Sequence, residues 1–234
     1  MSESLGLWAV VPVKRFAQTK RRLMPLLAHN ERGALARAML ADVLSALTRT
    51  HALAGIMVIT DDADAAAMAH AAGALVVPDV ENTGTTAAVT QAARHLAGCG
   101  RDGMLMVPAD VPLITPADIE QIVAAHHAAP SVTLVPASAD GGTNAFACSP
   151  PAAVACCFGD NSFRRHREAA RAGGIEPQIL QLEHVGHDID RPDDLAAFLL
   201  RPSRTQSYAY LTAIGTAVRL RRTHRVRCDE PCAG

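Results

Sequence analysis

Three aspartates stand where their carboxylates could serve phosphate chemistry. Asp110 comes shortly after the apolar run 104–107, and Pro108 ends that run because proline has no N–H to give to a strand ladder. A charge at the carboxyl end of a buried strand lies where open α/β sheets bind their ligands. Asp-x-Pro is also ordinary turn chemistry, so this stretch alone leaves both interpretations of Asp110 open.

The other two aspartates, Asp188 and Asp190, alternate along one segment. On an extended chain both carboxylates point to the same side, where they repel unless a cation lies between them. Hard carboxylate oxygens suit magnesium. His184 and His187 raise the alternative of zinc, but no cysteine has the spacing of a zinc site. We therefore expect Mg²⁺ as the cofactor.

A basic segment, 14–23, follows the first predicted strand directly and holds five cationic residues. The chain has 22 basic residues, of which only Lys14 and Lys20 are lysines, and both lie here. Lysine offers a compact charge that suits a phosphate oxygen. The segment contains no glycine, so it is neither a P-loop nor a dinucleotide-binding fingerprint. A solvated charged face is the alternative interpretation.

A second polar segment, 158–163, precedes a helix expected to run to residue 172. Ser162 is placed to cap this helix, and Gly159 lets the backbone approach a ligand closely. The start of such a helix binds anions through its free N–H groups and its dipole. An ordinary capped helix is the alternative.

Alternating strands and helices must position these residues. Short apolar runs predict strands at 8–13, 55–60, 74–78, 104–107, 132–136, 145–148 and 177–182. Helical periodicity and capping signals predict helices at 31–50, 62–72, 85–97, 115–128, 163–172 and 191–200. This alternation predicts a single Rossmann-like α/β domain over 1–200, with a mostly parallel central sheet covered by helices on both faces. Residues 201–234 are expected to add a C-terminal helix at 208–220 and a mobile basic tail.

The composition of the chain limits the kinds of partner that the protein is expected to bind. The 234-residue chain has a net charge of −1 and only 3% aromatic residues, so neither nucleic acid nor a membrane surface is expected as a partner. No apolar stretch approaches the roughly 20 residues that span a bilayer. The six cysteines form no C-x-x-C pair and indicate reduced thiols, which favours a cytoplasmic location. Whether the chain forms a homodimer stays open.

Five motifs together resemble a known family. The runs VPVKRFAQTKRRL, MVPADVPLI, GGTNAF, FGDNSFRRH and HDIDRPDDL occur in the order and approximate spacing of the CofC-like guanylyltransferases. These belong to the nucleotide-diphospho-sugar-transferase-like superfamily, and the resemblance covers about residues 7 to 200. It implies transfer of GMP from GTP to 2-phospho-L-lactate, phosphoenolpyruvate or 3-phospho-D-glycerate, with release of pyrophosphate, in the biosynthesis of coenzyme F-420.

The resemblance also implies roles for twelve residues. By position, Lys14, Lys20 and Arg22 would neutralise the GTP phosphates, Val13, Asp61 and Thr86 would contact the nucleotide, Asp110, Asp188 and Asp190 would hold magnesium, and Thr143, Gly159 and Ser162 would seat the acid. Two positions depart from the family pattern. Gly84-Thr85-Thr86 stands where relatives often have Gly-Leu-Asn, which affects the guanosine contacts, and Arg191 stands where relatives often cap a helix with threonine.

The residues agree with this chemistry independently of the family. A phosphate nucleophile is mostly ionised at neutral pH, because its second pKa is about 6. It needs no Ser-His-Asp triad, and the sequence offers no persuasive one. Positioning, cationic residues and a metal around the α-phosphorus suffice. Another nucleotidyltransferase of the superfamily and a non-catalytic nucleotide-binding regulator remain the alternatives.

Overall fold

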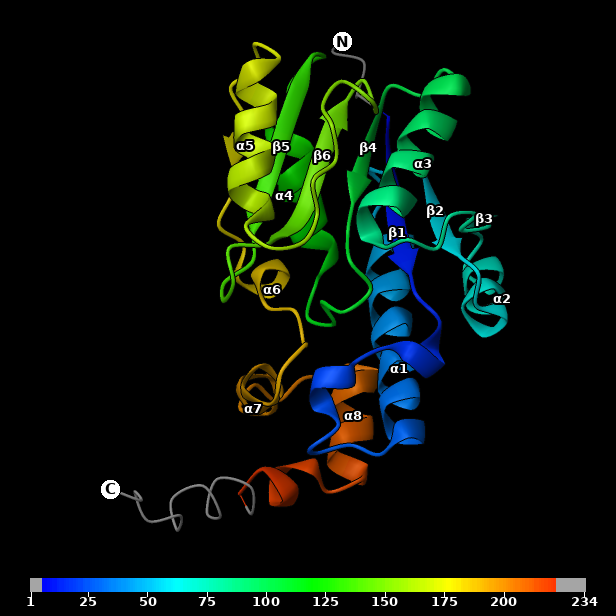
Figure 1. The fold of residues 1–234 in the computed structure, drawn as a ribbon, viewed down its shortest axis with the longest axis vertical. Helices are drawn as coiled ribbons and strands as arrows, with labels where there is room; N and C mark the ends of the chain where they lie inside the picture. The colour runs from blue at the N-terminus through cyan, green and yellow to red at the C-terminus, as the bar shows by residue number, and fades with distance from the viewer. Residues whose placement is uncertain (1–5, 222–234) are drawn as a thin grey trace.

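Seven apolar segments pair into one sheet, in the order β3-β2-β1-β4-β6-β5-β7 (Figure 1). The computed structural model describes residues 6–221 of the chain. The strands are β1 (Leu7–Val13), β2 (Gly55–Thr60), β3 (Leu75–Val77), β4 (Gly103–Met106), β5 (Ser131–Pro136), β6 (Thr143–Ser149) and β7 (Gln178–Ile179).

Parallel pairing dominates, as expected. β1 lies between β2 and β4 and runs parallel to both, whereas β6 is antiparallel to β4 and β5. The carboxyl ends of β1 and β4 therefore meet at one edge of the sheet, and the segments that begin at Lys14 and Pro108 leave from there. β7 is shorter than the predicted 177–182, because its pairing with β5 ends at Ile179 and Leu182 already starts the next helical turn.

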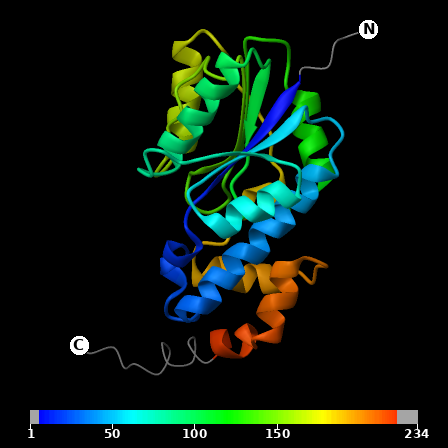
Figure 2. The ribbon, with the colours of Figure 1, turned by 90° about the vertical axis from the view of Figure 1, so that its right-hand side faces the viewer.

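Helices cover both faces of the sheet. The α-helices are α1 (His29–Thr48), α2 (Ala63–Ala71), α3 (Thr85–Gly98), α4 (Pro116–Ala125), α5 (Ser162–Ala172), α6 (Glu183–Gly186), α7 (Pro192–Leu199) and α8 (Gln206–Ala213). Two 3₁₀ turns, η1 (Phe16–Gln18) and η2 (Arg21–Leu23), lie in the basic segment. Figure 2 shows α3 and α5 on one side of the sheet and α1, α2 and α4 on the other.

Successive side chains of β1 point to opposite faces of the sheet and pack into two different hydrophobic cores, one on each face. Ala9 and Val11 pack into the cluster that includes α1, α2 and α4, whereas Val10 packs into the cluster that includes α3 and α5. Both clusters contain fully buried side chains of β1 and β4. A strand that is buried on both faces reads as a continuous apolar run, which is why these strands could be predicted from the sequence.

The end of the described chain folds back onto α1. Ser207, at the start of α8, donates to Asp42 through its backbone N–H (2.9 Å) and its hydroxyl (2.6 Å). Arg219 pairs with Glu31 on α1. The predicted single helix at 208–220 is interrupted at Ile214 and Gly215 (φ 70°), and the chain is helical again at 216–221. The basic tail expected beyond residue 221 lies outside the described residues.

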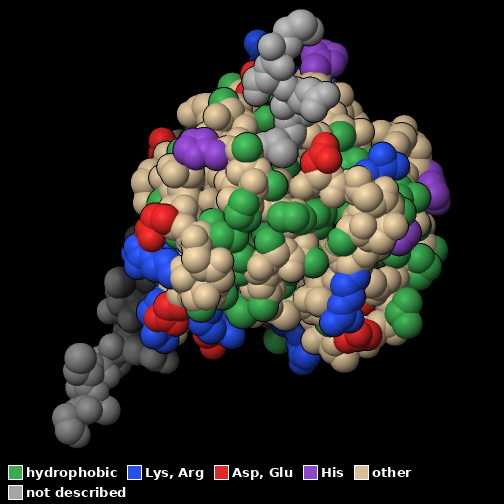
Figure 3. Space-filling view, turned by 90° about the horizontal axis from the view of Figure 1, so that it is seen from above, with side chains coloured by type: hydrophobic (Ala, Val, Ile, Leu, Met, Phe, Trp, Pro, Cys, Tyr) green, Lys and Arg blue, Asp and Glu red, His purple; other side chains and the backbone are tan. Residues whose placement is uncertain are grey.

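The two ends of the sheet differ in character. Figure 3 views the end around the amino ends of the strands, where basic, acidic and histidine side chains are interspersed with apolar ones. The basic segment and the three aspartates singled out above lie at the opposite, carboxyl end. Within residues 6–221, no helix has the length and apolar character needed to cross a bilayer.

Candidate active site

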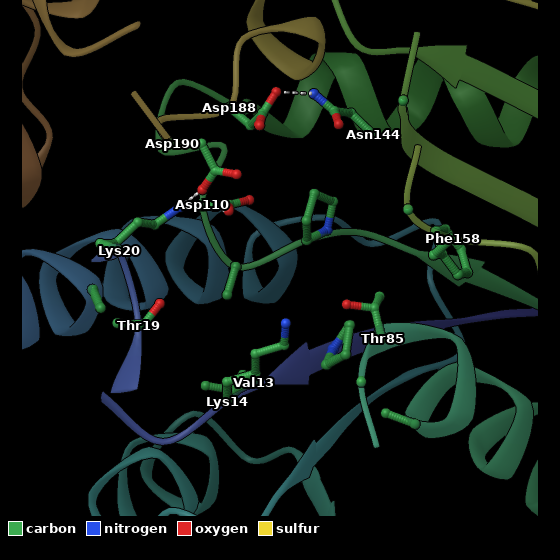
Figure 4. Close-up of a pocket in the computed structure, with 18 of the residues that line it drawn as sticks. Val13, Lys14, Thr19, Lys20, Thr85, Asp110, Asn144, Phe158, Asp188 and Asp190 are labelled. Carbon is green, nitrogen blue, oxygen red and sulfur yellow. Dashed lines mark hydrogen bonds and ion pairs between the residues drawn. The ribbon is translucent and has the colours of Figure 1, made fainter. Parts of the chain in front are cut away.

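A cleft of about 550 Å³ opens at the carboxyl ends of β1 and β4 (Figure 4). Ligand pockets commonly measure about 300–1,000 Å³, so the cleft is large enough for a nucleotide and part of a second small molecule. Ten of the twelve predicted site residues line it, and only Asp61 and Thr86 do not.

The three predicted metal ligands converge. Asp110, Asp188 and Asp190 each offer a carboxylate oxygen, and these oxygens all lie within 4.8 Å of one another. Asp110 follows β4, whereas Asp188 and Asp190 come from the segment between α6 and α7. The backbone N–H of Ile189 donates to the Asp110 carbonyl at 3.0 Å, which ties the two segments together.

Lys20 lies against this acidic cluster. Its ammonium is 2.7 Å from Asp110 Oδ2 and 2.7 Å from Asp190 Oδ1 (Figure 4). The Lys20 side chain is only 3% exposed. Its backbone adopts the left-handed conformation (φ 53°, ψ 38°), an uncommon one for a residue with a side chain. The sequence predicted Lys20 as a phosphate contact, and the structure shows that it lines the cleft with its ammonium paired with two carboxylates.

Charge and burial shift the pKa values of the cluster. Burial lowers the pKa of Lys20, but Asp110 and Asp190 outweigh burial, so its pKa lies above the ordinary value. For Asp190, burial raises the pKa, but Lys20, Arg22 and Lys14 outweigh it and hold the pKa below the ordinary range. Burial raises the pKa of Asp188 to about 6, and the charge of Asp110 adds to this effect.

The donor set fits a magnesium ion. Three hard carboxylate oxygens that lie within 4.8 Å of one another are the kind of ligands that Mg²⁺ prefers. The hydrogen bond to the Asp188 carboxylate comes from a neutral amide, Asn144 Nδ2, at 3.0 Å. The raised pKa of Asp188 is what is expected of a buried carboxylate beside like charges, and a bound cation would relieve it.

The basic segment forms the adjoining wall of the cleft. Lys14 follows β1 directly and lines the cleft together with Val13 (Figure 4). Arg22 is exposed, with Nη1 3.7 Å from Asp190 Oδ2. Arg15 turns the other way and binds Asp61 Oδ2 at 2.8 Å. Asp61, a predicted nucleotide contact, is therefore engaged next to the cleft rather than in its lining.

The opposite wall carries the predicted acid-binding residues. Thr143 is 6% exposed and Ser162 is 1% exposed, and the Ser162 hydroxyl donates to Thr143 Oγ1 at 3.3 Å. Gly159 has φ 107°, a conformation that L side chains rarely adopt, which explains a glycine at this point of the wall.

The expected capping role of Ser162 is wrong. Asn161, in the left-handed conformation, is the N-cap residue, and Ser162 is the first residue of α5. The backbone N–H of Ser162 donates to the Gly159 carbonyl (3.0 Å), and that of Phe163 donates to the Gly141 carbonyl (3.1 Å). Loop carbonyls thus bind two N–H groups at this helix start, and the contribution of Ser162 to the cleft is its hydroxyl.

Asn144 and Thr85 line the cleft but are not among the twelve site residues predicted from the sequence. Asn144 donates to both the Val185 carbonyl and Asp188 Oδ1 at 3.0 Å, which orients that carboxylate. Thr85, rather than Thr86, lines the cleft at the start of α3 (Figure 4). Thr86 Oγ1 instead donates to the Phe158 carbonyl at 3.3 Å. Asn144 follows Thr143 in the GGTNAF motif, and this adjacency was the available signal.

The start of α7 is held by Asp194 rather than by a side-chain cap from Arg191. Arg191 is the N-cap residue of α7 and its side chain makes no capping hydrogen bond. Asp194 compensates in part, because its carboxylate accepts the backbone N–H groups of Asp190 (3.0 Å) and Arg191 (2.7 Å). This arrangement holds the segment that carries Asp188 and Asp190 onto the start of α7.

Solved structures with the same arrangement of strands and helices show to which class of protein the fold belongs. A structure from Desulfovibrio desulfuricans G20, assigned to the nucleotide-diphospho-sugar transferases, matches with a TM-score of 0.73 at 17% identity, over 92% of this chain and 96% of that one. A nucleotidyl transferase from Methanothermobacter thermautotrophicus matches with a TM-score of 0.56 at 16% identity, over 82% and 95% of the two chains. The fold is therefore that of the nucleotide-diphospho-sugar transferases.

Sequence comparison then gives the family. The model of the CofC-like guanylyl transferases matches residues 7–230, and the chain belongs to this family. A phosphoenolpyruvate guanylyltransferase of Conexibacter woesei is 34% identical over 194 residues, 82% of this chain and 87% of that protein. A 2-phospho-L-lactate guanylyltransferase of Methanothermobacter thermautotrophicus is 31% identical over 211 residues, 90% and 92% of the two chains.

Proposed function

We propose that this protein transfers GMP from GTP to a small phosphorylated three-carbon acid, in the biosynthesis of coenzyme F-420. An oxygen of the acid's phosphate forms a bond to the α-phosphorus of GTP. The bond from the α-phosphorus to the bridging oxygen breaks, and pyrophosphate leaves with the electron pair. Membership of the CofC-like family and the names of the two relatives support this reaction.

One observation carries the proposal: a single cleft holds three converging carboxylates, a cationic segment and a pair of buried hydroxyl groups. Phosphoryl-group transfer needs charge neutralisation and positioning more than it needs a nucleophilic side chain. Lys14 and Arg22 supply positive charge at the mouth of the cleft, where the triphosphate would lie. Thr143 and Ser162 supply hydroxyl groups on the opposite wall, where the acid would lie.

Asp110, Asp188 and Asp190 would hold Mg²⁺. When bound, this ion supplies positive charge that draws electron density from the phosphoryl oxygens and offsets the charge that develops on them. Asn144 and Lys20 orient the carboxylates, because they donate hydrogen bonds to Asp188 and to the Asp110–Asp190 pair. As part of this proposed function, the protein binds GTP and acts in the cytoplasm.

The test is a matrix of nucleotides and acids. The purified protein is incubated with magnesium, each of the four ribonucleoside triphosphates, and phosphoenolpyruvate, 2-phospho-L-lactate or 3-phospho-D-glycerate. Pyrophosphate release and the mass of the product are measured. We expect turnover with GTP and with at least one of the acids, and the preferred acid identifies the physiological substrate class. Turnover with CTP alone would instead indicate another nucleotidyltransferase, and binding without pyrophosphate release would indicate a regulator.

A further inference from the structure

A buried histidine lies directly behind the acid-binding wall. His166 on α5 is 0% exposed, and its ring stacks on Phe146 with 4.7 Å between ring centroids. Phe158, next to Gly159 in the cleft wall, contacts the same ring edge-on, also at 4.7 Å. The ring is thus held between two aromatic side chains, and its two nitrogens have fixed directions.

Its hydrogen bonds assign the position of the imidazole proton. The backbone N–H of Cys157 lies 2.8 Å from Nε2, and because a backbone amide only donates, Nε2 must be the unprotonated acceptor. Burial lowers the pKa of His166 to about 4, with a further contribution from the charge of Arg165, so the ring is neutral near pH 7. A neutral imidazole carries one proton, which therefore resides on Nδ1.

This assignment fixes the hydroxyl of Thr143. His166 Nδ1 lies 3.0 Å from Thr143 Oγ1 and donates to it, and the Ser162 hydroxyl donates to the same oxygen at 3.3 Å. A hydroxyl oxygen has two lone pairs, and both are now engaged. The remaining Thr143 proton meets no acceptor among residues 6–221, and Thr143 borders the cleft.

We infer that His166 is a positioning residue that holds the Thr143 hydroxyl as a donor towards the acid substrate. The inference rests on the proposed function, because it takes the phosphorylated acid as the ligand of this wall. A carboxylate or phosphate oxygen can accept the hydrogen bond from the Thr143 hydroxyl. A ligand group that only donates cannot accept it, so the Thr143 hydrogen and the ligand's hydrogen would both lack an acceptor. The His166–Thr143 pair thereby selects an anionic oxygen without placing a charge in the wall.

If His166 acts only by stabilising the fold, its replacement should affect the KM for the acid independently of Thr143. A double-mutant cycle distinguishes this alternative from the positioning role. Thr143→Val removes the hydroxyl while keeping its shape, and His166→Phe removes both nitrogens while keeping the ring. We expect each single variant to raise the KM for the acid by about tenfold or more, with the KM for GTP unchanged. In the Thr143→Val background, His166→Phe should add no further increase, because the hydroxyl that it positions is already gone.

Conservative variants refine the cycle. The amide nitrogen of asparagine falls near the position of Nδ1, so His166→Asn should restore part of the acid KM, whereas His166→Gln should not. The matched control is His126→Phe. His126 is also buried and also binds a threonine and a serine, Thr133 and Ser149, but it lies outside the cleft lining. That control should lower the melting temperature and leave the acid KM unchanged.

A measurement without substrate keeps the inference testable whether or not the variants fold. Nitrogen-15 NMR of the histidine side chains in the wild-type protein reports which ring nitrogen carries the proton. We expect the Nδ1–H form at His166 from pH 6 to 8. An Nε2–H form, or acid KM effects that multiply in the double mutant, would overturn the inference. Wild-type protein that releases no pyrophosphate in the nucleotide and acid matrix, but shows the Nδ1–H form, would instead refute the proposed function.

Discussion

The ammonium of Lys20 lies 2.7 Å from a carboxylate oxygen of Asp110, although 90 residues separate the two in the sequence. The same ammonium lies 2.7 Å from Asp190, so one buried cation bridges two of the three clustered carboxylates. Like charges this close repel strongly away from bulk water. Lys20 therefore stabilises the acidic cluster when no metal ion is bound, and it sets the separation between β4 and the segment before α7.

Removal of this cation should weaken the metal-free protein. In the presence of a chelator, Lys20→Met leaves Asp110 facing Asp190, and we expect unfolding to become easier by about 1–3 kcal/mol. Magnesium should restore more stability to this variant than to the wild type, because it replaces the missing positive charge. Thermal melts with and without magnesium check both points. Lys14→Met is the control, because Lys14 is exposed and lowers the pKa of Asp190 less than Lys20 does, and it should lower the melting temperature much less than Lys20→Met. Equal melting of the two variants would contradict the bridging role.

The acidic cluster itself should control turnover. Asp110→Asn or Asp190→Asn removes one negative charge while keeping the side-chain shape, and we expect turnover to fall by at least about 100-fold, roughly 3 kcal/mol of transition-state stabilisation. Steady-state rates over a magnesium titration provide the measurement. Asp193→Asn, close in sequence but outside the cleft lining, is the matched control. Near-normal magnesium-dependent activity in either cluster variant would rule out its role as a metal ligand.

Substitutions of two adjacent threonines, Thr85 and Thr86, should affect the binding of different substrates. Thr85 lines the cleft, whereas the Thr86 hydroxyl donates to the Phe158 carbonyl in the loop of the acid wall. We expect Thr85→Val to raise the KM for GTP and Thr86→Val to raise mainly the KM for the acid, each by a few fold. The wild type should strongly prefer GTP over ATP, because the phosphates are common to both and only the base edge discriminates. Comparable turnover of ATP, or an exchange of the two KM effects, would contradict this assignment.

The sequence predicted the layered fold because it depends on local patterns, whereas the grouping of Asp110 with Asp188 and Asp190 came from the resemblance to the family. Apolar runs and helix signals place the carboxyl ends of β1 and β4 at the same end of the sheet, and Asp110 lies four residues after the last residue of β4. The alternation of Asp188 and Asp190 places both carboxylates on one side of an extended segment. The convergence of the two segments depends on a distant contact, the hydrogen bond from the Ile189 N–H to the Asp110 carbonyl.

Features that depend on distant contacts were not predictable. The partners of Lys20 are 90 and 170 residues away, so no local pattern indicates that its ammonium pairs with carboxylates. The antiparallel direction of β6 depends on where the chain re-enters the sheet after β5. Asn161 rather than Ser162 occupies the N-cap position of α5, and the carbonyls of Gly141 and Gly159 accept the first N–H groups of the helix in place of a side-chain cap. His166 was missed because its role depends on a network that joins β6 to α5.

Buried histidines should make the fold sensitive to acid. Burial lowers the pKa of His126 to about 4, with a contribution from the charge of His127, whereas the unfolded chain titrates near about 6.5. Between these values the unfolded state binds a proton that the folded state does not. Stability is therefore full above the unfolded pKa, and it falls by up to about 1.4 kcal/mol per pH unit as the pH drops from 6.5 to 4.

Urea denaturation at pH 7.5, 6.5, 5.5 and 4.5 measures this dependence. His126→Gln should show a shallower loss of unfolding free energy over this range than the wild type, with the remaining slope due in part to His166. The exposed residue His51 provides the control variant, His51→Gln, which should follow the wild type. An unchanged slope in His126→Gln would show that this histidine is not the source of the acid sensitivity.

The hydroxyl of Ser162 should report on the orientation of the two substrates. It is 1% exposed and donates to Thr143, and the backbone N–H of Ser162 is already bound to Gly159, so the hydroxyl is the group that Ser162→Ala removes from the wall. Ser162→Ala removes a donor that holds the Thr143 hydroxyl in place, and a hydrogen bond between neutral groups contributes about 0.5–1.5 kcal/mol. We expect the KM for the acid to rise a few fold, the KM for GTP to stay nearly unchanged, and the melting temperature to fall slightly because a buried hydrogen bond is lost. Ser45→Ala, at an exposed position on α1, is the control for a serine substitution. If the KM for GTP rises and that for the acid does not, then the wall formed by β6 and the start of α5 binds the nucleotide, and the acid occupies the side near Lys14 and Thr85.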